Sequence, residues 1–337
     1  MDPLTQGVMG AVAAQQVSQI KQPKYIVAAT VLGLLSGMAS DLDVLFRSDV
    51  DPLLSLEYHR HFTHSLLFIP FGGLLCAAFF FVVFARRVGL TFWQTYLYCT
   101  AAYATHGLLD ACTSYGTQLL WPFSDARVAW NTISIIDPLF TVPLLVCIIV
   151  AAIRRSRRWS VAALVWVLIY SGFGIVQRER AESFAEQLAQ QRGHTPTDIS
   201  AKPSFANLLV WKIVYTTDDS FYVDAVRTGL GYIHYPGAKV ARLHTADDFP
   251  WLEPSSQQAK DVERFRWFSN GYIALSPNHP NRIIDIRYSL LPNEIQGLWG
   301  VELDANKAVD EHVNYVSDHE RDSQTFDRLW KMIIGVQ

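Results

Sequence analysis

The chain has 337 residues, of which 50% are hydrophobic and 18% charged, with a formal net charge of -3 at pH 7. This near-neutral balance argues against nucleic acid as the main partner. The mean hydropathy of +0.14 averages two unlike halves. Long apolar stretches dominate up to about residue 177, whereas charged and polar residues recur every few positions beyond it. Because a bilayer-spanning helix needs roughly 18 or more nearly uncharged residues, the first half predicts a membrane domain.

Six stretches of residues 1–177 are candidate spans, which predicts an α-helical membrane bundle. They are Leu4–Ile20, Tyr25–Ala39, Ser65–Ala85, Phe92–Cys112, Ile135–Ile153 and Val161–Gln177. The first two are short and rich in Ala and Gly, which suits a tightly packed helical hairpin with its turn at Gln22–Lys24. An amphipathic hairpin lying on the membrane is the alternative for these two. The opening MDPLTQG has an acid where a signal peptide needs basic residues, so we expect no cleavable leader.

Basic residues in the loops predict the orientation of the bundle. Three loops carry them, with Lys21 and Lys24 in the first, Arg86 and Arg87 in the second, and Arg154, Arg155, Arg157 and Arg158 in the third. If the spans alternate in direction, all three loops lie on one side of the membrane. The positive-inside rule makes that side cytoplasmic.

Acidic and histidine residues gather at the opposite ends of the predicted spans. They are Asp2, Asp41, Asp43, His59, His61, His64, His106, Asp110, Asp125 and Asp137. Ionisable residues near a bilayer are costly and usually functional. We therefore expect a functional cluster on the extracytoplasmic face. The four cysteines are scattered singly in apolar stretches without zinc-type spacing, so we expect them to be small buried hydrophobes.

The spacing of these residues favours a metal site. His106 and Asp110 are four residues apart, which places both on one helix face. The texts DLD (41–43) and HRHFTHS (59–65) add two carboxylates and three imidazoles. Imidazole and carboxylate groups are the ligands of zinc and other divalent ions, and the set suffices for two or three of them. No GxSxG elbow, Walker A motif or dinucleotide fingerprint is present in the sequence.

Four short sequence motifs together resemble those of a known family. MDPLT (1–5), SDLD (40–43), HRHFTHS (59–65) and THGLLDACTSYGTQLLWPFS (105–124) resemble the YdjM-like family of inner-membrane metal-dependent hydrolases, over about residues 1–150. The resemblance implies a multi-pass protein of a bacterial inner membrane. It also implies that the metal-site candidates are Asp41, Asp43, His59, His64, His106 and Asp110.

The resemblance ranks the remaining polar residues of these texts. Arg60, Thr63 and Ser65 would be supporting groups, and His61 ranks lower because family members usually carry a small residue there. A more distant similarity, of ligand pattern only, links the chain to the zinc-dependent phospholipase C and P1 nuclease group. That similarity favours phosphodiester hydrolysis.

The sequence departs from the family pattern at its first segment. Family members often have histidine in an MDxxTH opening, whereas here Gln6 follows Thr5. Because Gln is a poor zinc ligand, Asp2 is the nearest substitute for a ligand from this segment.

The second half predicts a helical linker, residues 178–200, and a small α+β domain, residues 201–337, with an antiparallel sheet. Short β-branched and aromatic runs broken by turn residues, such as 207–226, 264–276 and 282–291, predict the strands. An even number of spans would make this domain extracytoplasmic. We expect Trp211, Trp267 and Trp299 to lie in its core. Its histidines lack ligand spacing and are expected at the surface or in turns; they are His234, His244, His279 and His312.

These observations lead to one main functional hypothesis. We expect a membrane-bound hydrolase with one to three divalent ions, zinc first, that acts on an ester or phosphoester, including one in a lipid. Asp43 or Asp110 would orient the attacking water or act as base, and Arg60 would bind an anionic substrate oxygen. The bilayer and such a substrate are the expected partners.

Two alternatives use the same residues. An ion or solute transporter would use the acids and histidines as a relay, but they gather at one membrane face and form no path through the spans. A metal-stabilised scaffold would bind ions with no open coordination position, while its outer domain binds another protein.

Overall fold

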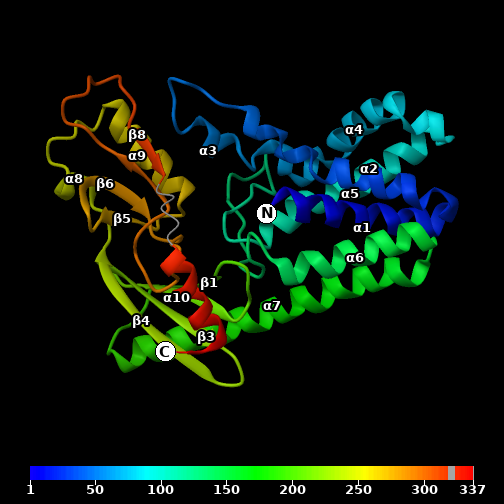
Figure 1. Cartoon of the computed structure of the whole chain (residues 1–337). Helices are drawn as coiled ribbons and strands as arrows, with labels where there is room; N and C mark the ends of the chain where they lie inside the picture. Colours follow the sequence, from blue (N-terminus) through cyan, green and yellow to red (C-terminus); the bar gives the residue numbers. More distant parts are fainter. Residues whose placement is uncertain (318–322, 337) are drawn as a thin grey trace. The chain divides into compact units, whose positions relative to one another are not determined.

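The computed structural model describes residues 1–317 and 323–336, which form two compact units (Figure 1). The first unit contains residues 1–46 and 58–175, and the second contains residues 47–57 and 176–337. The chain passes from the first unit to the second for the last time within one continuous helix, α7 (Arg157–Gln191).

The first unit is helical, as predicted, and its helices lie where the six spans were expected. Within the described residues the helices before α7 are α1 (Pro3–Lys21), α2 (Ile26–Gly37), α3 (Leu54–Tyr58), α4 (Ile69–Val83), α5 (Phe92–Ala111) and α6 (Pro138–Arg154), with short 3-10 helices between them. Among these residues, three segments are long and apolar enough to cross a membrane: Pro23–Leu45, Leu66–Val83 and Arg157–Gln191. The number of six spans is therefore not confirmed. One reason is the polar sequence of α1, because three glutamines between residues 15 and 19 lower its mean hydropathy.

Polar caps determine where several helices begin. The Asp2 carboxylate accepts a hydrogen bond from the Thr5 amide at 3.0 Å and Pro3 is the first helical residue, so α1 starts at Pro3. Asp137 caps α6 in the same way. Thr91 and Gln94 form a reciprocal capping box at the start of α5.

Helices α1 and α2 pack closely enough that only glycine fits between them. A Cβ atom at Gly10 would lie 2.4 Å from the carbonyl oxygen of Gly33 and 2.8 Å from Cα of Gly37. These neighbours are backbone atoms, which have little room to move. The Ala- and Gly-rich text of the first two helices is therefore explained by a tight helix pair.

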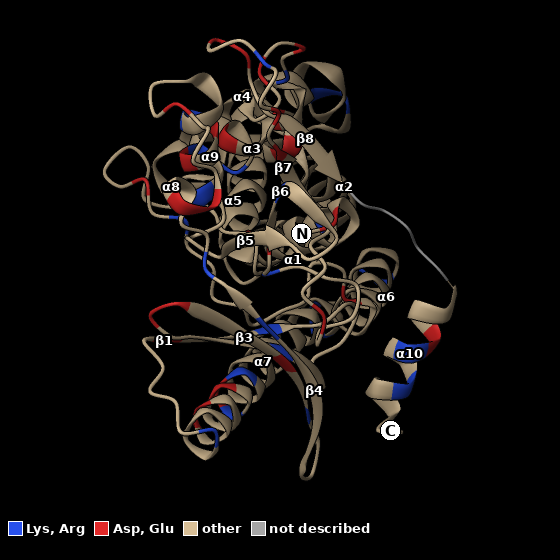
Figure 2. Ribbon diagram, turned by 90° about the vertical axis from the view of Figure 1, so that its left-hand side faces the viewer, with Lys and Arg blue, Asp and Glu red and all other residues tan. Residues whose placement is uncertain are grey.

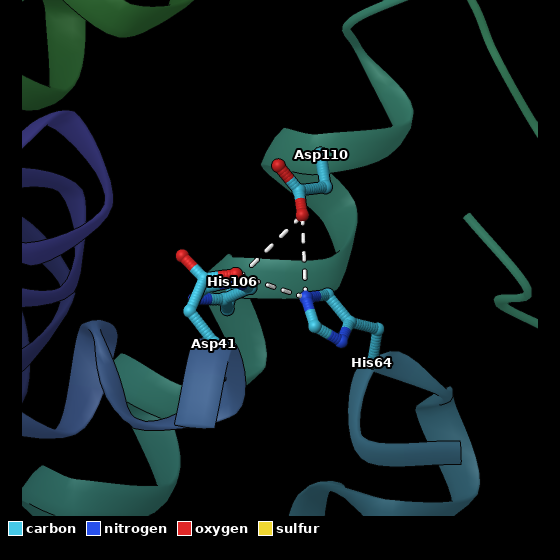
Figure 3. A group of neighbouring side chains, drawn as sticks. All are labelled: Asp41, His64, His106 and Asp110. Carbon is cyan, nitrogen blue, oxygen red and sulfur yellow. Dashed lines mark hydrogen bonds and ion pairs between the residues drawn. The ribbon is translucent and has the colours of Figure 1, made fainter. Parts of the chain in front are cut away.

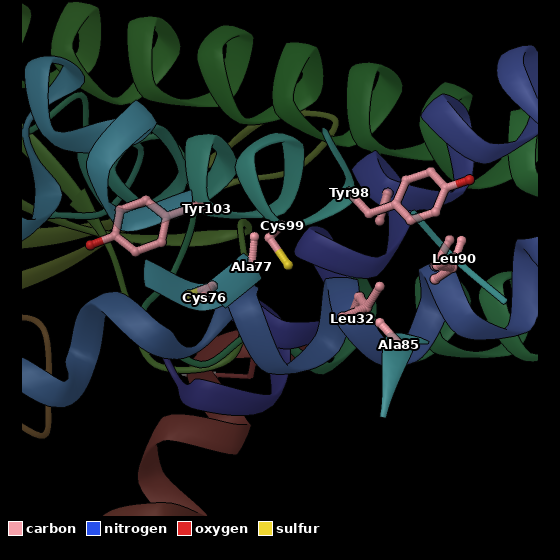
Figure 4. Packing of buried hydrophobic residues seen from close by; sticks show 10 residues of the cluster. Leu32, Cys76, Ala77, Ala85, Leu90, Tyr98, Cys99 and Tyr103 are labelled. Atoms are coloured by element: carbon pink, nitrogen blue, oxygen red, sulfur yellow. The ribbon is translucent and has the colours of Figure 1, made fainter. Parts of the chain in front are cut away.

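A hydrophobic cluster fills the space between α2, α4 and α5. Figure 4 shows Leu32 of α2, Ala77 of α4, and Tyr98 and Cys99 of α5 packed together. Each of these side chains is at most 1% exposed. Cys99 thus behaves as the small buried hydrophobe that the sequence predicted.

The three basic loops lie at the same end of the first unit. The Tyr25 hydroxyl, in the α1–α2 turn, donates to the Gly89 carbonyl in the α4–α5 turn at 2.8 Å. Gln16 Nε2, near the end of α1, donates to the Ser160 carbonyl in the first turn of α7 at 2.7 Å. The helices therefore alternate in direction, as the charge pattern required.

The second unit contains two antiparallel sheets, which confirms the α+β prediction. The first sheet has the order β1 (Asp198–Pro203), β2 (Val210–Thr216), β3 (Ser220–Thr228), β4 (Tyr232–Ala241). The second has the order β5 (Ile273–Ser276), β6 (His279–Asp285), β7 (Trp299–Glu302), β8 (Asn314–Ser317). Buried Val214 and Phe221 of the first sheet pack against Ala274 and Ile284 of the second.

Helices complete the second unit, and one of them corrects a prediction. They are α8 (Thr245–Asp248), α9 (Gln257–Phe268), α10 (Ser323–Ile334) and the polar half of α7, whose charged residues are visible in Figure 2. The run 264–276 was expected to form a strand, yet its first five residues belong to α9. The reason is a cap outside the run, because Ser256 Oγ accepts from the Ala259 amide at 3.2 Å.

A loop from the first half of the sequence belongs to the second unit. Within residues 47–57, Asp51 and Glu57 both bind Arg264 of α9, at 2.8 Å and 2.5 Å respectively. The two ends of this loop return to the first unit, where Asp43 and His59 lie.

We expect Gly10→Ala to destabilise the first unit. Because the added methyl group meets backbone atoms of α2, the cost is that of an overpacked interior, about 1–3 kcal/mol. Thermal unfolding in one detergent measures it. Gly172→Ala in α7 is the matched control, since no atom lies within 4 Å of its Cβ position. Equal midpoints for the two variants would contradict the close contact of α1 with α2.

Candidate metal centre

Four of the predicted ligands converge from three segments of the first unit (Figure 3). Asp41 comes from the 3-10 helix Ala39–Leu45, His64 ends the 3-10 helix Phe62–His64, and His106 and Asp110 lie on α5. One ligand atom of each residue lies within 4.8 Å of the others. His64, His106 and Asp110 have fully buried side chains, whereas that of Asp41 is 20% exposed. A site with one partly exposed ligand is rigid and still reachable from solvent.

A glycine allows α5 to approach the histidine loop. A Cβ atom at Gly107 would lie 2.2 Å from the His64 carbonyl oxygen. Any other residue would push the loop away from α5 and separate His64 from His106. Gly107, in the sequence THGLLD, is therefore needed for the close approach of α5 to the loop of His64, which the motif alone did not reveal.

The ring of His106 is oriented for binding through Nε2. Its Nδ1 lies 2.6 Å from the Gly37 carbonyl oxygen. Since a carbonyl only accepts, Nδ1 carries the proton and Nε2 of the neutral ring is left with a lone pair. Nε2 faces Asp41 Oδ1 at 3.3 Å. Metal-ligating histidines are typically fixed in this way, by a backbone carbonyl or carboxylate on the other ring nitrogen.

His64 has an equivalent arrangement with a carboxylate. Its Nδ1 lies 3.2 Å from Asp43 Oδ2 and its Nε2 lies 3.3 Å from Asp110 Oδ2. Among the described residues, His64 Nε2 and Asp110 Oδ2 are buried atoms without a hydrogen bond of good geometry. Two such atoms facing each other are suited to act together as ligands of one cation.

The other atoms around Asp110 hold it in place. Its Oδ1 accepts from Gln6 Nε2 at 2.9 Å and from the Met1 amine at 2.6 Å. Arg60 Nε lies 3.1 Å from Oδ2, and its guanidinium also donates to Thr113 at 3.1 Å. Gln6, where the sequence departs from the MDxxTH opening of the resembled family, thus supports a candidate ligand through a hydrogen bond.

Asp43 links the cluster to a second group. Its Oδ2 accepts from the Arg60 amide at 3.0 Å and from the Thr63 hydroxyl at 2.9 Å, while Oδ1 lies 2.8 Å from His59 Nδ1. Asp41, Asp43 and His59 form a further group with metal-ligand spacing. Asp41 belongs to both groups.

Other residues singled out from the sequence lie outside both groups. Asp2 caps α1, and Ser65 accepts from the Phe68 amide. His61 packs against the rings of Tyr58 and Trp121. In the second unit, His234 and His312 lie within hydrogen-bond distance of Asp224 and Asp261, at 3.0 Å and 2.8 Å.

The sequence did not reveal two of the groups that orient the ligands. The Gly37 carbonyl and the Gln6 amide contact His106 and Asp110 across the bundle. No motif marks Gly37, and the MDxxTH-like opening drew attention to Gln6 only as a departure, without indicating its contact with Asp110.

The local electrostatic field favours a cation. Burial alone lowers the pKa of His64, but the neighbouring carboxylates of Asp110, Asp41 and Asp43 outweigh it and raise that pKa to about 10. The carboxylates therefore stabilise a positive charge where two imidazoles and two carboxylates converge. This donor set fits zinc and other divalent ions, and these residues form a candidate metal-binding site.

Comparisons with known proteins agree with the membrane assignment. A family model described as YdjM inner membrane protein matches residues 1–181. A Bacillus subtilis (strain 168) protein, YfhP, described as uncharacterized, is 24% identical over 288 residues, which is 83% of each chain. The Escherichia coli (strain K12) inner membrane protein YbcI is 33% identical over 125 residues, or 35% of this chain and 66% of that protein.

No solved structure matches the chain. The distant similarity to the phospholipase C and P1 nuclease group is not confirmed by any of these matches.

We expect zinc affinity to rise with pH. His64 carries a proton below its raised pKa of about 10, and that proton must leave before Nε2 can bind an ion. Between about pH 6 and about pH 9, weaker proton competition should increase affinity roughly tenfold per pH unit. Calorimetric zinc titrations in two buffers of different ionisation enthalpy measure the released proton. His61→Gln should titrate like the wild type, and a pH-independent affinity contradicts the expectation.

Proposed function

The chain belongs to the YdjM inner membrane protein family, and from this premise we propose that it is a membrane-bound, metal-dependent hydrolase. The proposed substrate is an ester or phosphoester, including one carried by a lipid. Zinc is the proposed metal, at Asp41, His64, His106 and Asp110, with a second ion at Asp41, Asp43 and His59. The observation that carries the proposal is the pair of imidazoles whose Nε2 atoms both face carboxylates inside a buried cluster.

The residues divide into ligands and positioning groups. A divalent ion at the cluster would supply Lewis acidity toward an ester or phosphoryl oxygen. Asp43 orients His64, and Arg60 orients Asp110. His59 and Asp41 are the partly exposed members of the cluster, with 23% and 20% of their side chains accessible. They are therefore the residues best placed to meet substrate and water.

The proposed base is Asp43, a buried carboxylate that lies next to the partly exposed His59. Asp43 Oδ2 is occupied by donors from Arg60 and Thr63, which leaves Oδ1, toward His59, as its reactive atom. In the form with one ion, at Asp41, His64, His106 and Asp110, the proton of an attacking water would pass to Asp43 Oδ1. Hydrogen bonds to Oδ2 keep the carboxylate fixed while it does so.

We propose that the site works at the extracytoplasmic face. The support is geometric, because the basic turns lie at one end of the first unit and the acid–histidine cluster lies at the ends of the helices remote from them. With the basic end cytoplasmic, the site faces outward, and the second unit, which follows α7, lies on the same outer side.

The two rival functions make different demands on the same residues. A transporter needs ionisable groups along the bundle, but deep polar residues such as Gln15 are neutral, its amide donating to Thr30 Oγ1 at 2.9 Å. A scaffold needs a closed ion site, and four protein ligands satisfy that as well. The partly exposed second group favours catalysis, because a purely structural ion needs no accessible ligand.

Metal content and turnover measured on the same samples test the proposal. The purified chain in detergent should contain one or two zinc equivalents and hydrolyse bis(p-nitrophenyl) phosphate or phospholipid in mixed micelles. His106→Ala should lose bound metal and more than about 100-fold of the activity, because loss of even an orienting partner of a ligand costs 10–100-fold. His61→Ala is the matched control, being a histidine of the same loop outside both groups, and should retain metal and activity.

Three other outcomes would contradict the proposed hydrolase function, and two of them support one of the alternative functions. Absence of metal from the wild type rules out the proposed chemistry. Stoichiometric metal without turnover of any ester or phosphoester supports the scaffold. Release of zinc across proteoliposomes by the wild type, lost in His106→Ala, supports the transporter.

A further inference from the structure

Exposed apolar side chains gather at one end of the first sheet of the second unit. In the antiparallel order β1-β2-β3-β4, the β1–β2 and β3–β4 turns lie at the same end of the sheet. Phe205, in the first of these turns, is 46% exposed, and Leu230, in the second, is fully exposed. Neither side chain gains anything from water, so this end of the sheet needs an explanation.

Helix α10 extends the apolar surface across this end. Leu329 and Met332 on its buried face pack against the sheet. Its outer face repeats Phe326, Trp330 and Ile334 at four-residue spacing, with exposures of 42%, 59% and 50%. The apolar stripe of the helix is therefore wider than the part that packs against the sheet, and its outer flank is left exposed.

Two contacts fix the place of α10 relative to the turns. The ring of Phe326 lies 6.3 Å from that of Phe205, near the β1–β2 turn. Arg227 Nε, at the end of β3, donates to the Ile333 carbonyl at 2.8 Å. We call the combined surface the apolar end, which consists of Phe205, Leu230, Tyr232, Phe326, Trp330 and Ile334.

The apolar end is attached to α7 where the apolar part of that helix stops. Gln177 Nε2 donates to the Thr228 carbonyl at 2.6 Å, and Arg180 Nη2 donates to the Gly229 carbonyl at 2.7 Å. The preceding residue, Val176, is 53% exposed and continues the outer surface of the candidate span. The opposite end of the sheet meets Arg192, which lies about 22 Å further along the chain at 1.5 Å per helical residue and donates to Tyr215.

We propose that the apolar end inserts into the interfacial layer of the same bilayer that α7 crosses. The membrane is the occupant because the lipid-facing surface of α7 continues directly into this end of the sheet. A helix with an apolar outer stripe lies in the plane of a membrane surface, and Trp and Tyr are enriched at that depth. The second unit is thereby held at the membrane by a surface as well as by its connecting helix. This attachment does not depend on the proposed hydrolase activity.

Site-specific quenching tests the proposal on the full-length chain. Leu230→Cys and Trp330→Cys are labelled with bimane in nanodiscs of phosphatidylethanolamine and phosphatidylglycerol that hold one copy each. Asp218→Cys, in the exposed β2–β3 turn at the other end of the sheet, is the matched control. Unsubstituted protein sets the background from Cys76, Cys99, Cys112 and Cys147.

The expected result is at least about threefold more quenching by headgroup-proximal spin-labelled lipid at residues 230 and 330 than at residue 218. Quenching by aqueous iodide should show the reverse order. Equal quenching at all three positions overturns the proposal. Protection that arises only in discs holding two copies assigns the apolar end to a second copy of this chain and also overturns it. The side chain at 230 is fully exposed, so that variant should fold normally.

Discussion

Three carboxylates held close together at the helix ends are the constraint on which the rest of the first unit depends. Asp41, Asp43 and Asp110 all approach the imidazole of His64, and like charges so placed are stable only with positive charge among them. Arg60 supplies one such charge beside Asp110. A proton on His64 supplies another and is the group that a divalent ion would displace. The architecture of α5 and the two 3-10 helices is the means of holding these groups in contact.

Much of this site could be predicted from the sequence, because its candidate ligands lie in short polar segments at the edges of apolar segments. Helical spacing alone brings His106 and Asp110 together. The contact of His64 with Asp41 depends on the tertiary structure, so the sequence could not predict it. The different roles of the individual carboxylates were not predictable from the sequence either. Asp43 and Asp110 differ in their hydrogen-bond partners, which come from residues as distant as Thr63 and Gln6.

The fold was predictable to a similar extent. The apolar stretches of the sequence predicted where the helices of the first unit lie. The number of membrane spans depends on details such as the glutamines of α1, which an average composition does not show. In the second unit the β2–β3 hairpin followed from its alternating pattern and Asp-Asp turn. The helix α9 did not, because its arginines and aromatics alternate like a strand, and its start is set by a serine outside that run.

The loop of residues 47–57 adds connections between the two units. Because this loop belongs to the second unit while its neighbours on both sides belong to the first, the backbone passes between the units three times. Two of those passages lie within a few residues of Asp43 and His59. His106, by contrast, lies on α5 in the middle of the long segment 58–175, far along the chain from any passage. The ligand positions Asp43 and His59 are therefore linked through short stretches of backbone to residues of the second unit.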